Sequence, residues 1–128
     1  MSYRWVDHTA ELELHVKATS AEGVLQDAMR ALAELLDGAS GSPVTKRVSL
    51  EAPDRGALLV RWLEELVFLA ETEGFVPEEV DITLGVVMDA TVRGRIGKPR
   101  PLVKAVTYHG LEFEPVGDGW HAKVVLDV

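Results

Sequence analysis

The 128 residues of the chain are the length of one ordinary domain, and a two-domain organisation has little room in it. The 13 Lys and Arg face 21 Asp and Glu, so the net charge of −8 disfavours strong direct binding of nucleic acid. The absence of cysteine excludes disulfides, thiolate metal sites and cysteine nucleophiles. No apolar stretch is long enough for a membrane span, so we expect a soluble, intracellular protein.

The first half of the chain predicts strands and helices that alternate. A period-two alternation of apolar and polar residues indicates a strand, and apolar residues at helical spacing after Ser20 and Asp54 indicate two amphipathic helices. Gly38 and Gly74 are placed to end these helices. The expected elements are a strand at 12–17, a helix from an N-cap at Thr19 or Ser20 to Gly38, a loop at 37–43, a strand at 44–50 and a helix from Asp54 to near Gly74.

From Val80 onward the pattern changes to short β-branched runs separated by turn residues. The turn at 117–119 is expected to join the segment 111–114 to the last strand as a hairpin. The other strands expected in this half are 81–85, 90–95, 103–108 and 120–128. These elements predict a single α+β domain over residues 1–128, with a mixed or antiparallel sheet and two helices packed on one face.

Three polar segments are candidates for a functional site. Residues 6–11 (VDHTAE) gather two carboxylates, an imidazole and a hydroxyl, but an ordinary turn is the preferred interpretation of this segment taken alone. Residues 104–110 (KAVTYHG) are likewise typical of a bulge or turn with a solvent-facing histidine. At the end of the chain the Asp127 side chain lies one residue from the terminal carboxylate of Val128. These two anionic groups repel each other unless a cation lies between them, and their oxygen ligands favour a hard cation such as calcium or magnesium. For this tail taken alone, a frayed terminus in which Asp127 only aids solubility is the preferred interpretation.

Other chemistry has little support in the sequence. The phosphate-binding loop, the dinucleotide fingerprint, the zinc-protease motif and the hydrolase nucleophile motif are all absent, so an enzyme has no motif to rest on. One local basic cluster surrounds the loop at 97–101, and exposure to solvent is its default interpretation. The members of this cluster are Arg95, Lys98, Arg100 and Lys104.

In the identity and the order of several short segments, the chain resembles the archease family, and the resemblance runs from end to end of the chain. It implies a small α+β protein similar to a strand-helix-strand-strand module with an inserted segment. The matching segments are DHTAE at 7–11, LEEL at 63–66, ETEGF at 71–75, VKAVTYHGL at 103–111, Gly119-Trp120 and the final Leu126-Asp127-Val128.

The resemblance implies a cytoplasmic accessory protein of tRNA splicing without a catalytic cycle of its own. Such a protein activates an RtcB-type RNA ligase by promoting its GTP-dependent guanylylation and multiple turnover. One alternative is a chaperone-like modulator of a tRNA cytosine methyltransferase. Another is a stand-alone metal-dependent hydrolase that uses Glu11, Asp127 and either His8 or His109 for acid and base work.

The resemblance also implies a site for a divalent metal ion, with calcium expected. By position its ligands are Glu11, Asp127 and Val128, the last through backbone and terminal carboxylate oxygens. The family's usual residue at the position of Glu11 is Asp, and Glu keeps the charge but is longer by one methylene. Asp7, His8 and His109 are expected to line the same region, either behind the ligands or in contact with a partner.

Overall fold

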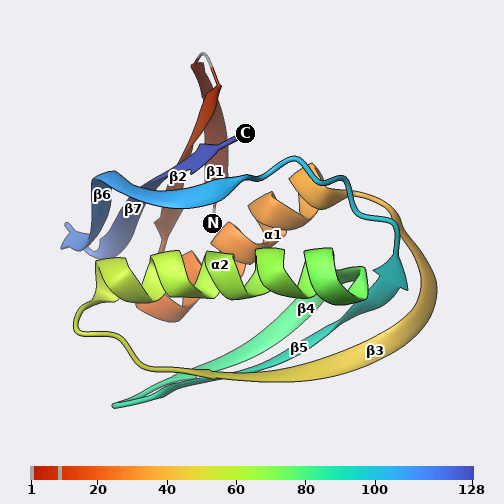
Figure 1. The fold of residues 1–128 in the computed structure, drawn as a ribbon. Helices are drawn as coiled ribbons and strands as arrows, with labels where there is room; N and C mark the ends of the chain where they lie inside the picture. The colour runs from red at the N-terminus through yellow and green to blue at the C-terminus, as the bar shows by residue number, and fades with distance from the viewer. Residues whose placement is uncertain (1, 9) are drawn as a thin grey trace.

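A computed structural model describes residues 2–8 and 10–128 of the chain. Within them, two helices lie between two antiparallel sheets (Figure 1), which confirms the predicted α+β class. The elements in chain order are β1 (Ser2–His8), β2 (Glu11–Ala18), α1 (Ala21–Leu36), β3 (Ala39–Leu50), α2 (Arg55–Glu73), β4 (Phe75–Leu84), β5 (Met88–Gly97), β6 (Ala105–Val116) and β7 (Gly119–Asp127).

The strands divide between a four-stranded sheet and a three-stranded sheet. Sheet A has the order β1-β2-β7-β6, sheet B has the order β3-β5-β4, and every pair of neighbours is antiparallel. Helix α1 packs against β2 of sheet A and β4 of sheet B, while α2 packs against β6 and β4. Both helices therefore form a middle layer that covers the inner face of each sheet.

Local signals set the helix boundaries where the sequence predicted them. The side chain of Ser20 accepts a hydrogen bond from the Gly23 N–H at 3.0 Å, and Asp54 accepts one from Ala57 at 2.8 Å. Gly74 ends α2 in the left-handed conformation, with a φ of 69°. Of the helices in the described residues, none combines the length and the apolar character needed to cross a bilayer.

A single hydrophobic core joins the layers. Trp62 of α2 is completely buried, and its indole N–H donates to the backbone carbonyl oxygen of Leu25 in α1 at 2.9 Å. Asp27 is a buried charged residue on α1, and the Arg30 guanidinium binds one of its oxygens at 3.0 Å. The two helices are thus fixed to each other by a hydrogen bond inside the core as well as by packing.

Both helices end at one close contact with β5, which we call the glycine junction (Gly38, Gly74 and Gly97). The Gly97 N–H donates to the Gly74 carbonyl oxygen at 2.8 Å, and the Lys98 N–H donates to that of Gly38 at 3.0 Å. A Cβ atom at Gly97 would lie 2.0 Å from the Gly38 carbonyl oxygen. Only a residue without a side chain fits at this approach.

Three features of the strands differ from the sequence predictions. The prediction of a loop at 37–43 is wrong from residue 39 onward, because β3 begins at Ala39 and pairs with β5 through a bulge. The edge position of β3 leaves room for Pro43, which cannot donate to a neighbouring strand. The predicted strands 103–108 and 111–114 are one strand, β6, interrupted by a bulge between Thr107 and Glu112. The first strand, β1, was not predicted.

Candidate functional site

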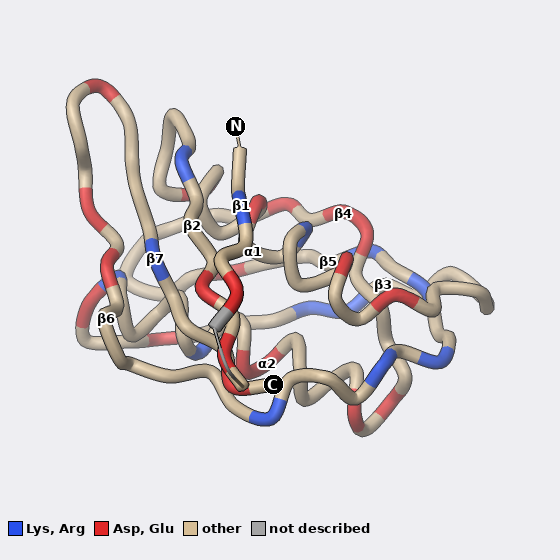
Figure 2. Tube along the Cα trace, turned by 90° about the horizontal axis from the view of Figure 1, so that it is seen from above, with Lys and Arg blue, Asp and Glu red and all other residues tan. Residues whose placement is uncertain are grey.

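The predicted metal residues lie where β2 begins and β7 ends. Glu11, the first residue of β2, is directly opposite Asp127, the last residue of β7. The backbone N–H of Val128 donates to the carbonyl oxygen of Ala10 at 3.0 Å. The structure thus brings Glu11, Asp127 and Val128 together, and Figure 2 shows acidic residues of β2 beside the end of the chain.

Strands on both sides hold Asp127 in place. Glu11 of β2 pairs with it on one side, and Ala105 of β6 pairs with it on the other. Its carbonyl oxygen also accepts a hydrogen bond from the Lys104 N–H at 2.7 Å. The last residues are therefore part of sheet A, and the frayed terminus considered above is not observed.

Two carboxylates on neighbouring strands suit a divalent cation. Residues directly opposite in an antiparallel pair project to the same face, with Cβ atoms about 4.5–5.5 Å apart. Glu11 and Asp127 are both half-buried, so their charges repel each other unless a cation or hydrogen-bond donors lie between them. Carboxylate and carbonyl oxygens are the ligands that calcium prefers. The donor set of these residues fits such an ion.

The turn that precedes Glu11 has an unusual backbone. Ala10 has a φ of 62°, a left-handed conformation that residues with a side chain rarely adopt. In this conformation its carbonyl oxygen receives the Val128 N–H, so the strained turn faces the end of the chain. Thr9, the other residue of the turn, lies outside the described residues.

Asp7, His8 and His109, which were expected to line the same region, lie at three different positions relative to Glu11 and Asp127. The strand register sets His8 opposite Glu11 and Asp7 opposite Leu12, so strand alternation directs Asp7 to the other face of the sheet. The side chain of His8 lies outside the described part of the chain. His109 is exposed in the β6 bulge, and its described hydrogen bond joins its own N–H to the Thr107 hydroxyl at 3.3 Å.

A second polar group on sheet A was not predicted from the sequence. Glu112, Glu114 and His121 offer three ligand atoms that lie within 4.8 Å of one another, so they could hold a metal ion. The Lys123 ammonium lies 3.1 Å from a Glu112 oxygen and already neutralises part of this charge. The signal for the group was the turn at 117–119, because the hairpin register sets Glu114 directly opposite His121.

The second group extends toward β2. The His15 ring centroid is 6.1 Å from that of His121, and the His15 Nε2 is 3.7 Å from a Glu13 carboxylate oxygen. Imidazole and carboxylate together make a donor set that also suits transition metals. The outer face of sheet A thus carries two groups of different chemistry, an oxygen-only pair and a mixed cluster.

One member of the basic cluster, Arg95, is paired with an acidic residue. Arg95 pairs with the Glu78 carboxylate at 3.3 Å and donates to the Gly41 carbonyl oxygen at 3.1 Å. Lys98, Arg100 and Lys104 are exposed side chains along the connection from β5 to β6. Their exposure agrees with the default interpretation of this loop as a solvated segment.

Comparison with known proteins identifies one family across the chain. Residues 3–128 match the model of the archease protein family. Curated archeases are similar at 34% identity from Methanosarcina mazei and at 30% from Archaeoglobus fulgidus. The first alignment covers 98% of this chain and 95% of the relative, and the second covers all of both.

Two solved structures share the fold. A protein from Methanobacterium thermoautotrophicum, solved in solution, has a TM-score of 0.78 and 26% identity, with 98% of each chain covered. A crystal structure from Thermotoga maritima, described as an archease and possible chaperone, has a TM-score of 0.72 and 25% identity. It covers 96% of this chain and 94% of the relative. The arrangement of two helices between two antiparallel sheets is therefore that of archease structures.

Proposed function

Because this chain belongs to the archease family, we propose that it is an accessory protein of tRNA splicing that activates an RtcB-type RNA ligase. In this role it promotes the GTP-dependent guanylylation of the ligase and its multiple turnover, without a catalytic cycle of its own. The family match over residues 3–128 is the observation that carries the proposal. The proposal places the protein in the cytoplasm together with its ligase.

The proposal includes a calcium ion held by Glu11, Asp127 and Val128. The pairing of Glu11 with Asp127 on neighbouring strands supports it, because one ion can then contact both carboxylates. When bound, the ion supplies positive charge that offsets the two carboxylates at this end of sheet A. The longer side chain of Glu11, compared with Asp, reaches further from the strand and alters the affinity of the site rather than its charge.

The chain's own residues give this site its rigidity. Val128 is tied to the turn through Ala10, and Asp127 is held between β2 and β6. A partner would therefore meet a preformed surface, for which less ordering entropy is lost on binding.

The experiment mixes the protein with its RtcB-type ligase and GTP, and measures the guanylylated fraction and the number of turnovers. Both should rise with the wild-type chain. Asp127→Asn should weaken calcium binding measured by calorimetry and reduce the activation. The matched control is Asp118→Asn, which removes an exposed carboxylate from the turn between β6 and β7. Unchanged ligase rates at every ratio of the two proteins would refute the proposal.

A second candidate function is favoured by one observation, the description of the Thermotoga maritima relative as a possible chaperone. A chaperone-like modulator of a tRNA cytosine methyltransferase would act through surface contact rather than through the acidic site. Suppression of methyltransferase aggregation should then be the same for the wild type and for Asp127→Asn. A loss of suppression in Asp127→Asn would contradict a chaperone-like action through surface contact alone, because it would show that the acidic site takes part.

A further inference from the structure

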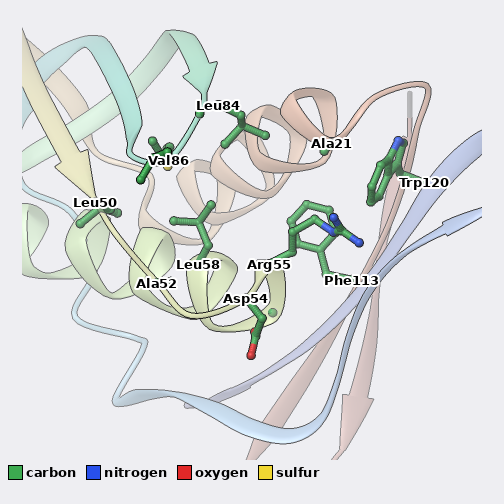
Figure 3. Close-up of a pocket in the computed structure, with 13 residues that line it drawn as sticks. Ala21, Leu50, Ala52, Asp54, Arg55, Leu58, Leu84, Val86, Phe113 and Trp120 are labelled. Carbon is green, nitrogen blue, oxygen red and sulfur yellow. The ribbon is translucent and has the colours of Figure 1, made fainter.

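A cavity of about 690 Å³ opens between the two sheets, at the ends where both helices begin (Figure 3). Its volume is in the range of sites that accommodate a ligand or a large side chain. The walls come from both sheets and both helices. The large apolar side chains that line it are Leu50, Leu58, Leu84, Met88, Phe113 and Trp120.

The rim of the cavity carries an apolar residue that nothing in the described chain covers. Val86, at the tip of the hairpin between β4 and β5, is 96% exposed. Hairpin tips are ordinarily polar, since water then solvates their side chains and backbone. A ligand contained within the cavity would leave Val86 in water, whereas an occupant that extends over the rim would cover it.

One cation faces the cavity without a carboxylate partner. The Arg55 guanidinium lies over the Trp120 ring at 4.7 Å, and the described residues place no carboxylate within 4.0 Å of it. The neighbouring Asp54 carboxylate caps α2 through the Ala57 N–H, and in Figure 3 it points away from the guanidinium. The N–H groups of Arg55 therefore remain available to an anion.

The helices strengthen this preference for negative charge. The first turns of α1 and α2 both reach the cavity, through Ala21 and Gly56. Each helix carries a partial positive charge at its N-terminus, and its unbonded N–H groups attract anions. In a chain with a net charge of −8, the lining of this cavity is neutral overall, because its charged residues are Asp54 and Arg55. Asp54 is already engaged as the helix cap, so Arg55 is the charge that an acidic group can meet here.

We propose that this cavity is the docking site for a segment of a partner protein that carries a large apolar side chain next to a carboxylate. The apolar side chain enters the space between Leu58 and Phe113, and the carboxylate pairs with Arg55. The backbone of the segment crosses the rim and covers Val86. The site is distinct from the acidic pair at the end of β7 and does not depend on the function proposed above.

The test titrates the ¹⁵N-labelled full chain with a short blocked peptide that contains phenylalanine followed by aspartate. Shift changes in the NMR spectrum should concentrate on the Arg55 side chain, Val86 and the Trp120 indole. A matched peptide with asparagine in place of aspartate should bind about 1.5- to fivefold more weakly, the range for an exposed ion pair. No shift change at these residues up to several millimolar peptide would overturn the proposal.

Variants separate the two parts of the interaction. Arg55→Gln should make the two peptides bind equally, and Val86→Asp should weaken both while the spectrum of the free protein stays that of the folded chain. Arg61→Gln is the control, because Arg61 is an exposed cation of the same helix that donates to the Glu51 carbonyl oxygen. Equal binding of both peptides by the wild type, or an unchanged preference in Arg55→Gln, would refute the role of the cation.

Discussion

The indole of Trp62 offers a direct test of how the two helices are held together. Trp62 is completely buried and donates a hydrogen bond to the Leu25 carbonyl oxygen at 2.9 Å. In Trp62→Phe that hydrogen bond is lost, at a cost of about 1 kcal/mol. The carbonyl keeps its partner within α1, so it is not left unpaired.

The packing loss adds to the hydrogen bond. Phenylalanine lacks three heavy atoms of the indole, and deletion of buried carbon atoms costs about 0.8 kcal/mol each, plus a term for the space left behind. We therefore expect Trp62→Phe to lower the free energy of unfolding by about 2–4 kcal/mol. For a chain of this length that is about 8–15 °C in Tm.

The assay is urea unfolding followed by far-ultraviolet circular dichroism, which does not depend on the tryptophan that is removed. The matched control is Trp5→Phe, because the Trp5 indole nitrogen is buried and has no hydrogen-bond partner among the described residues. Removal of an unpaired donor relieves its desolvation cost, so this variant should lose less than about 1 kcal/mol. Equal losses for the two variants would refute the assignment of the stabilisation to the Trp62 hydrogen bond and its packing.

Three further predictions concern single residues. Burial and the hydrogen bond to Glu34 raise the pKa of Tyr3 to about 12. The free energy of unfolding should therefore fall as the pH rises from 10 to 12. In Tyr3→Phe, both this fall and the matching step in an absorbance titration of tyrosine should disappear. Ala10→Gly should be neutral or stabilise by up to about 1 kcal/mol in urea unfolding, because glycine relieves the left-handed strain, whereas a loss above 1 kcal/mol would contradict that strain. Gly97→Ala should destabilise by about 1–3 kcal/mol in the same assay, against little change for Gly85→Ala, where a Cβ has room.

The helices could be predicted from the sequence because their signals are local. Ser20 and Asp54 cap the two helices as expected, and Gly74 ends the second. The division of the strands into two sheets could not be predicted, since it depends on which strands pair across long stretches of chain. β1 was missed for a related reason: polar and aromatic residues alternate only from Ser2 to Trp5, and its pairing with β2 is what defines the rest of the strand.

The candidate site shows the same limit. The resemblance to a family suggested Glu11 and Asp127 together, but only the register of β2 and β7 shows that they are directly opposite. The group at Glu112, Glu114 and His121 was within reach of the sequence. Its hairpin turn had been predicted, and counting outward from that turn pairs Glu114 with His121. The sequence analysis predicted the turn but did not derive from it which residues of the two strands lie opposite each other.

The glycine junction has a consequence for how the molecule opens. Each of its hydrogen bonds joins a glycine that follows the end of a helix to the end of β5, through the amides of Gly97 and Lys98. Neither helix terminus can separate from β5 without exposing one of these amides to water. Fraying, which in most helices is an independent event at each end, is here shared by α1, α2 and sheet B. The two amides should therefore exchange their hydrogens as one unit, and their common rate reports the cooperative opening of half the fold.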